Sequence, residues 1–189
     1  MRLDGKARAL TTWDVADDRA IVEACLAGDT DAFDAIVERH RRQVYQLCFR
    51  YVGNHEDASD LAQDAFIRAF KGLGGFKGQS SLSTWLYRIA VNVCLNRVAL
   101  KTPRTEALEP AERIDSRAER PDVALMRAER AFEVRAAIRH LPPRQRATLI
   151  LRVYHELPHE EIAAILGSSV GAAKANFFHA LANLKKLLR

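Results

Sequence analysis

The stretch HEEIAAILGSSVGAAKANFFHALANL, residues 159–184, decides how the C-terminal part of the chain folds. Pro158 precedes it and suits the first turn of a helix, where its missing N–H is harmless. Gly167 permits the left-handed conformation that ends a helix, and Ser168 or Ser169 can cap the next one. Two helices joined by so tight a turn form a helix-turn-helix, a motif that many DNA-binding proteins use.

The second of these helices, expected over residues 169–188, has an apolar stripe opposite a face of small side chains. At about 100° per residue, the stripe consists of Val170, Ala173, Phe177, Leu181, Leu184 and Leu188. The opposite face consists of Ala172, Ala175, His179, Ala182 and Lys186, flanked by Lys174 and Phe178. Small side chains let a helix approach a DNA groove closely, and an exposed aromatic ring can contact a thymine methyl group. The alternative is an ordinary amphipathic helix at the end of a bundle.

The rest of the chain also shows helical periodicity, and we find no convincing alternation of the kind that predicts strands. The longest helix is expected between Thr30, a candidate N-cap, and Gly53, a candidate stop. Its apolar face consists of Phe33, Ile36, Val37, Val44, Leu47, Cys48 and Tyr51. Further helices are expected over residues 17–26, 54–70, 82–99, 144–154 and 158–166. Helical spacing also runs through Leu125, Ala128, Phe132 and Ala136. The fold class is therefore expected to be all-α.

A segment between two helical regions divides the chain. Residues 101–124 begin KTPRTEALEPAERIDSRAERPD, with three prolines, many charges and almost no large apolar side chain, which is typical of a flexible linker. The sequence therefore predicts an N-terminal tail over 1–16, a helical domain over 17–100, a linker over 101–124 and a second helical domain over 125–189.

Charge and composition narrow the function. Residues 1–100 hold 13 Lys and Arg against 13 Asp and Glu, whereas residues 125–189 hold 11 against 5. The basic excess of the C-terminal domain favours an anionic partner there. No apolar run is long enough to span a membrane, and the N-terminus has no apolar core typical of a secretory signal. We expect a cytoplasmic protein that does not insert into membranes.

No catalytic or metal site is expected. Cys25, Cys48 and Cys94 lie far apart without a CxxC spacing, and small buried side chains are the simplest interpretation of them. The six histidines are scattered, with no spacing typical of a nucleophile–base pair or of metal ligands. Because Pro158 separates His155 from His159, they do not share a helix face. The sequence predicts neither an enzyme nor a bound cofactor.

Three stretches together resemble a known family. LPPRQRATLILRVYHELPHEEIAAILGSSVGAAKANFFHALANL, residues 141–184, resembles region 4 of the extracytoplasmic-function (ECF) sigma factors of bacterial RNA polymerase. GGFKGQSSLSTWLYRIAVNVCLNR, residues 74–97, and residues 31–73 before it resemble their region 2. The resemblance covers nearly all of 17–100 and 125–189, in order. It implies binding to core RNA polymerase, promoter recognition and DNA opening, without catalysis by this chain.

The resemblance also assigns residues in region 2. It implies that the acidic helix docks on the clamp coiled coil of the largest polymerase subunit through Asp60, Gln63 and Asp64. It places recognition of the promoter −10 element on Phe76, Lys77, Gln79, Ser80, Arg88 and Asn92. Phe76 and Asn92 match positions that flank a pocket for a flipped non-template base, where a ring can stack and an amide can hydrogen-bond. Trp85, Leu86 and Ile89 are more readily explained as core.

In region 4, the resemblance implies recognition of the −35 element by Lys174, Ala175, Asn176, Phe178, His179 and Lys186, with Arg144 and Arg146 on phosphates. Many family members carry an Arg- and Ser-rich recognition helix, whereas the corresponding helix of this chain has few basic residues. Because arginine commonly reads guanine, we expect a different −35 sequence and more dependence on DNA shape. The family further implies contact with the polymerase flap region and control by an anti-sigma factor.

Weak DNA contacts are compatible with this role if both domains are held on one polymerase, since the second contact then forms at high effective concentration. A rival interpretation is a stand-alone helix-turn-helix repressor or activator whose N-terminal half binds a ligand or dimerises. Residues 17–100 show no pattern typical of a ligand pocket or a phosphoacceptor, which favours the first interpretation.

Overall fold

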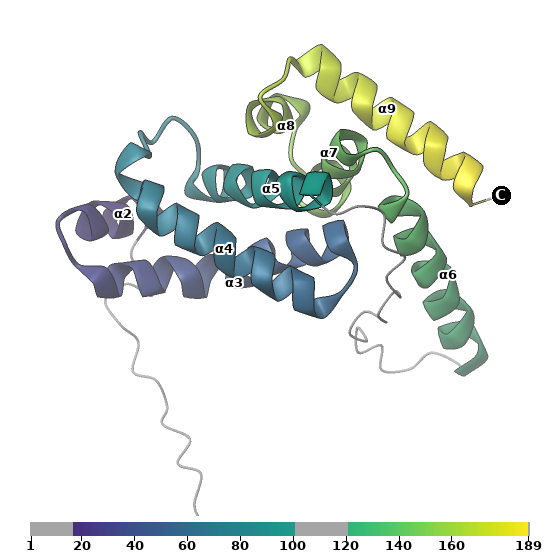
Figure 1. Cartoon of the computed structure of the whole chain (residues 1–189), viewed down its shortest axis with the longest axis horizontal. Helices are drawn as coiled ribbons and strands as arrows, with labels where there is room; N and C mark the ends of the chain where they lie inside the picture. Colours follow the sequence, from purple (N-terminus) through teal and green to yellow (C-terminus); the bar gives the residue numbers. More distant parts are fainter. Residues whose placement is uncertain (1–16, 101–120, 189) are drawn as a thin grey trace, which may run out of the picture.

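In the computed structural model, residues 17–100 and 121–188 are described, and every regular element in them is helical (Figure 1). The elements are α2 (Asp18–Leu26), α3 (Thr30–Val52), α4 (His55–Gly72), the short 3-10 helix η1 (Leu73–Gly75), α5 (Leu82–Leu100), α6 (Pro121–Arg139), α7 (Pro143–Tyr154), α8 (His159–Leu166) and α9 (Val170–Leu187). These ranges contain no strand, which confirms the expected all-α class. None of the described helices is long and apolar enough to cross a bilayer.

In the N-terminal unit, α2–α5, capping residues fix where the helices begin and end. Asp17 caps α2 by accepting from the Ala20 amide at 2.7 Å, and Asn54 caps α4 by accepting from the Asp57 amide at 2.7 Å. Gly53 ends α3 with a φ of +84°, a conformation that costs glycine little. Asp29, rather than the expected Thr30, caps α3, because its carboxylate accepts from the first free amides of the helix.

The core of this unit lies between α3, α4 and α5, which run side by side, while α2 lies across one end of α3 (Figure 1). Ile36, Leu47 and Tyr51 of α3 are almost completely buried, as their helical spacing predicted. Cys48 and Cys94 are fully buried with their sulfurs 3.9 Å apart, so they fill the core as small side chains. Cys25 is partly exposed.

The C-terminal unit is formed by α7, α8, α9 and the end of α6. Gly167, with a φ of +57°, closes α8, and Ser169 caps α9 by accepting from the Ala172 amide at 3.1 Å. This confirms the helix-turn-helix. The buried face of α9 is rotated from the predicted stripe: Ala173 and Ala180 are fully buried, whereas Leu181 and Leu188 are 46% and 44% exposed. The prediction erred because the small Ala180, which is fully buried, carries little weight in a hydrophobicity pattern.

The second unit begins earlier than its sequence pattern suggests. Helix α6 starts at Pro121, so residues 121–124, expected to belong to the linker, are helical. Proline suits a first helical turn, where its missing N–H is not needed. The expected tail over 1–16 and the expected linker over 101–120 lie outside the described residues.

The two units contact each other through polar and aromatic side chains. The Tyr51 hydroxyl donates to the Pro143 carbonyl at 3.2 Å, and the Arg50 guanidinium lies 3.7 Å from the centre of the Tyr154 ring. Helix α5 also contacts α8 and α7 (Figure 1). These contacts place the C-terminal unit against the α3 and α5 side of the N-terminal unit.

His155 makes this junction sensitive to pH. Its ring lies 4.7 Å from the Tyr87 ring, and its Nε2 is buried without a hydrogen-bond partner. Burial, with a further contribution from Arg50, lowers the pKa of His155 to about 4. Between about pH 6.5 and 4 the unfolded chain therefore binds a proton that the folded chain excludes, so stability falls as the pH falls through that window.

We expect His155→Phe to reduce this pH dependence, because a phenyl ring keeps the contact with Tyr87 but cannot be protonated. Each pH unit in the window contributes at most about 1.4 kcal/mol through His155. The measurement is the free energy of unfolding of both proteins at pH 7.5 and pH 5. Equal losses of stability in the two proteins would rule out a contribution from His155.

Candidate nucleic-acid and polymerase interfaces

A polar face of α5 and the loop before it bring together the residues assigned to the −10 element. Arg88 and Asn92 are one helical turn apart, and both side chains are exposed. Trp85 lies on the same side of the helix, and its ring is 5.2 Å from that of Phe76, at an angle of 49°. Trp85 and Phe76 are both partly buried against the core. The face therefore combines an aromatic pair on a rigid base with two solvent-accessible polar groups.

The loop between η1 and α5 presents the remaining predicted residues of this site. Lys77, Gln79 and Ser80 are all exposed. Gly78 has a φ of +66°, which turns the chain between Lys77 and Gln79. The Ser81 hydroxyl accepts from the Thr84 amide at 3.1 Å and so fixes the beginning of α5. The loop is thus anchored at both ends while its side chains stay in solvent.

The carboxylates of the acidic helix α4 have two kinds of surroundings: some are exposed to solvent, and others pair with arginines. Asp60 and Gln63 are exposed on one face, as expected for a docking surface. Asp64 is on the same side but forms a double contact with Arg68, one turn further, through two N–O distances of 3.0 Å. Asp57, in the first turn of α4, is 8% exposed, and its carboxylate accepts from Arg97 at 2.7 Å.

Two apolar side chains that the sequence pattern did not single out extend this face of α4. Ile67 is 47% exposed and Phe70 is 50% exposed. They follow Asp60 and Gln63 at helical spacing, so that acidic and apolar groups form one stripe. Phe70 also contacts the Phe33 ring edge-on at 4.9 Å. Large apolar residues in the outward positions of an amphipathic helix are the sequence signal that could have revealed them.

Helix α9 exposes most of the residues assigned to the −35 element. Lys174, Ala175, Phe178 and His179 are exposed, and Phe178 is 68% exposed. Lys186 is exposed near the C-terminal end, whereas Asn176 is half-buried. Because the buried face is centred on Ala173 and Ala180, the outward centre of the helix moves toward Ala175 and Phe178. Phe178 is therefore central to the exposed face, and not at its flank as expected.

The two arginines of α7 have different surroundings, and one prediction needs correction. Arg144 is exposed, and its guanidinium donates to the Leu166 carbonyl at 3.4 Å, near the turn of the helix-turn-helix. Arg146 is only 9% exposed. It donates to three backbone carbonyls: that of Tyr51 at 3.0 Å, that of Leu141 at 3.2 Å and that of Arg139. In this arrangement Arg146 is committed to the junction and does not face a phosphate, which sequence spacing could not reveal.

The junction also places an acidic residue beside the α5 face. The Thr84 hydroxyl donates to the Glu161 carboxylate of α8 at 2.7 Å. Thr84 precedes Arg88 by one helical turn. Helix α8 therefore lies next to the face that carries Arg88 and Asn92, while these two side chains remain exposed.

Two family models match the chain, one in each helical unit. Sigma-70 region 2 matches residues 36–102, which include α4, η1 and α5. Sigma-70, region 4 matches residues 131–184, which include the helix-turn-helix.

Characterised proteins are similar over most of their length. The RNA polymerase sigma-H factor of Pseudomonas aeruginosa is 34% identical, with 91% of this chain and 94% of that protein covered. The ECF RNA polymerase sigma factor SigW of Bacillus subtilis is 36% identical, with 86% and 91% covered. The ECF RNA polymerase sigma-E factor of Escherichia coli is 35% identical, with 86% and 90% covered.

Solved structures share the fold at lower sequence identity. CnrH in its complex with the cytosolic domain of CnrY gives a TM-score of 0.67 at 23% identity and covers 90% of this chain and 96% of that one. The sigma factor RpoE of Bartonella quintana, in complex with the anti-sigma factor NepR, gives a TM-score of 0.63 at 22% identity and covers 82% and 96%. The match to both sigma regions in order, together with relatives of this identity and coverage, shows that the chain belongs to the ECF family of RNA polymerase sigma factors.

Proposed function

We propose that this ECF sigma factor binds core RNA polymerase through α4, reads the −10 element with α5 and its preceding loop, and reads the −35 element with α9. The observation that carries the proposal is the separation of three exposed faces on three helices, each anchored in a core. The chain itself supplies no catalytic group in this scheme.

The α4 stripe suits a partner with basic and apolar groups, because Asp60 and Gln63 are followed by the exposed Ile67 and Phe70. By family resemblance, that partner is the clamp coiled coil of the largest polymerase subunit. Asp64 contributes less net charge than Asp60 because Arg68 already pairs with it. We therefore rank Asp60 above Asp64 as an electrostatic contact.

We expect Asp60→Lys to weaken binding to core polymerase by about tenfold or more, because a like-charge contact at an interface costs at least about 1.4 kcal/mol. The matched control is Asp34→Lys, which reverses an exposed carboxylate on α3. Dissociation constants for core polymerase, measured by fluorescence titration at two salt concentrations, test this. An equal loss of affinity in both variants would exclude the α4 stripe as the docking surface.

At the −10 element, Phe76, whose ring packs against that of Trp85, supplies a stacking surface, and Asn92 supplies an amide that can both donate and accept hydrogen bonds. Flipping a base costs a few kcal/mol, and one stacked ring offers about 1–3 kcal/mol. These terms nearly balance, so opened DNA is captured only when further contacts are present. Arg88 is positioned to provide one of them by holding a phosphate.

At the −35 element, α9 offers small side chains around Phe178 and few positive charges. Because Arg146 is buried, four exposed basic residues are available to contact phosphates: Lys174, Lys185, Lys186 and Arg144. Four neutralised phosphates correspond to a slope of about −3.6 in a plot of log affinity against log salt. The isolated unit therefore binds DNA weakly, and the polymerase joins it to the −10 contact through effective concentration.

An anti-sigma factor is the partner that we propose for the inactive protein. RpoE of Bartonella quintana was solved in complex with such a factor, and it shares the fold of this chain. The exposed apolar side chains on α4 and α9 are suitable contacts for a protein partner.

The proposal is tested by transcription with purified core polymerase on genomic DNA fragments. We expect discrete run-off transcripts with the factor and none without it, whereas the free factor should shift the same promoter fragments only weakly at physiological salt. A palindromic footprint formed without polymerase would instead support the stand-alone repressor. If no transcript starts with any fragment, the proposed function is wrong.

A further inference from the structure

The outward face of α9 carries an aromatic ring among small side chains. Phe178 is 68% exposed, more than any other aromatic side chain in the described part of the chain. Ala175 and Ala182 lie one helical turn before and after it on the same side of the helix. The ring of His179 meets the Phe178 ring edge-on, with the two ring centres 5.9 Å apart. The phenyl ring is therefore accessible to a partner, and two of its neighbours are too small to cover it.

The rest of α9 supplies few groups that could hydrogen-bond the edge of a base. The helix contains neither an acidic residue, which would accept from cytosine, nor an arginine, which would bind guanine. Amides suit adenine, but Asn183 donates to a glutamine side chain of α7 at 2.9 Å, and Asn176 is half-buried. Lys174 and His179 are the exposed polar side chains closest in sequence to the phenyl ring. Hydrogen bonds alone therefore give this face little selectivity.

Thymine is the base that an apolar face can select. It alone presents a methyl group in the major groove, and proteins read that group by apolar contact. At about 1.5 Å per residue, Phe178 lies about 12 Å from the start of α9, which is about the width of the major groove. A helix that enters the groove by its N-terminal end therefore brings this ring to the bases. The neighbouring alanines allow the backbone to approach them closely.

We propose that Phe178 selects thymine in the −35 element by packing against its methyl group. The proposal rests on the proposed role of α9 at this element, and adds to it the base that is read and the kind of contact that reads it. Removal of the methyl group from the DNA and removal of the ring from the protein break the same contact. The two losses of affinity should therefore not add.

The test uses the full chain bound to core polymerase and a promoter that this complex transcribes. In a second template, deoxyuridine replaces every thymine of the −35 element on both strands, which removes the methyl groups but keeps the hydrogen-bonding groups. We expect the unmodified protein to bind the deoxyuridine template about fourfold more weakly for each contacted methyl group. Competition between the two templates for open-complex formation measures this ratio.

Phe178→Ala should bind the two templates equally. Because Phe178 is largely exposed, this change should leave the fold intact. The matched control is Leu187→Ala, which truncates another exposed apolar side chain of α9, 48% exposed and about half a turn round the helix axis from Phe178. The control variant should distinguish the two templates as the unmodified protein does.

The same reactions separate this proposal from the proposed function. Transcription from the thymine template reports whether the chain acts as a sigma factor, whereas the ratio between the two templates reports whether a methyl group is read. Equal binding of both templates by the unmodified protein would overturn the methyl contact while leaving the proposed function in place. An equal preference for thymine in Phe178→Ala would also overturn it, because deoxyuridine would then act through DNA shape rather than through the ring.

Discussion

Replacement of Phe76 by alanine is expected to reduce open-complex formation by roughly 10- to 100-fold, because it removes a base-stacking surface of about 1–3 kcal/mol. Asn92→Ala should cause a loss in the same range by removing the amide that reads the flipped base. Neither change should alter affinity for core polymerase, since neither residue belongs to the α4 stripe. Permanganate reactivity of the −10 region and core-binding titrations measure the two quantities separately.

The chain offers a close control for this prediction. Asn96 is an exposed asparagine on α5, one helical turn after Asn92 and further from the loop that carries Phe76. Asn96→Ala should leave promoter opening nearly unchanged, and Phe76→Trp should retain most of the activity because an aromatic surface remains. If Asn96→Ala and Asn92→Ala were equally defective, the pocket would not lie where we place it. Loss of core binding in Phe76→Ala would contradict the assignment in another way.

Arg146→Met is expected to destabilise the protein by about 3 kcal/mol, which corresponds to a melting temperature lower by roughly 6–12 °C for a chain of this size. The guanidinium of Arg146 satisfies carbonyls of Tyr51, Arg139 and Leu141 and lies 5.0 Å from the centre of the Tyr51 ring. Methionine retains the apolar stem but leaves these carbonyls without a donor. The cost of burying the guanidinium, which also lowers the pKa of Arg146, offsets part of the gain from these bonds.

The control for this change is Arg144→Met, two residues earlier on α7. Arg144 is exposed and makes one long hydrogen bond of 3.4 Å, so its loss should cost about 0.5 kcal/mol or less. Calorimetry should also show whether the two units of Arg146→Met unfold in separate transitions, because Arg146 connects α7 to the end of α3. Equal melting temperatures for the two variants would show that the buried contacts contribute no net stability.

We expect promoter recognition to compete with the contact between α8 and α5. The Glu161 carboxylate accepts a hydrogen bond from Thr84, which precedes Arg88 by one helical turn. A negative charge at this place repels the phosphates of a DNA strand that approaches Arg88. In the proposed function, we expect the polymerase to separate the two promoter contacts along DNA and so to draw the C-terminal unit away from this position. We therefore expect α8 to lie elsewhere, relative to α5, when the protein is bound to a promoter.

Local patterns in the sequence determined most of the fold. The turn at Gly167 with the cap at Ser169, the stop at Gly53 and the cap at Asn54 follow from backbone conformation and short-range hydrogen bonds, which neighbouring residues decide. Helical periodicity likewise identified the core positions of α3. The exposed positions of Asp60, Gln63, Arg88 and Asn92 are predictable in the same way, since a helix with a known buried face leaves its other side to solvent.

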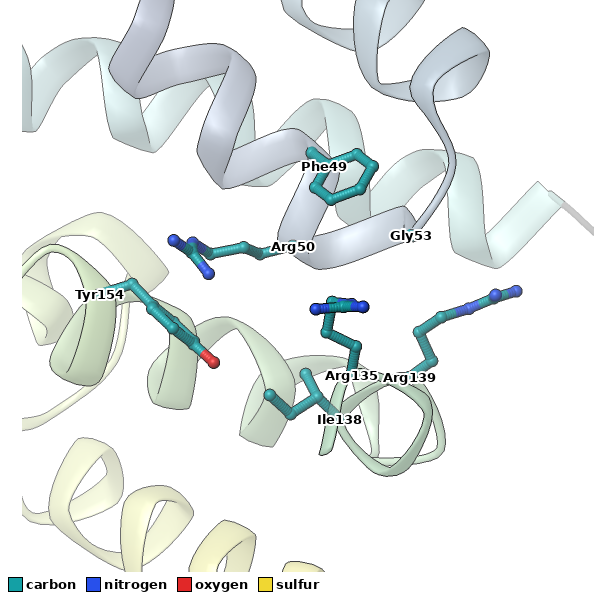
Figure 2. Close-up of a pocket in the computed structure, with 7 residues that line it drawn as sticks. All are labelled: Phe49, Arg50, Gly53, Arg135, Ile138, Arg139 and Tyr154. Carbon is teal, nitrogen blue, oxygen red and sulfur yellow. The ribbon is translucent and has the colours of Figure 1, made fainter. Parts of the chain in front are cut away.

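Only the tertiary structure decided which of the remaining polar side chains are exposed and can contact a partner. In the sequence, Asp57 and Arg146 are indistinguishable from surface residues, but both are buried in the structure. Arg97 donates to the Asp57 carboxylate, and Arg146 donates to three backbone carbonyls. Ala180 is buried where α9 packs against its neighbouring helices, and a small pocket lined by Phe49 and Ile138 lies where α3 meets α6 (Figure 2). These features arise from contacts between residues far apart in the chain. Periodicity describes one helix at a time and contains no information about the partner that it meets.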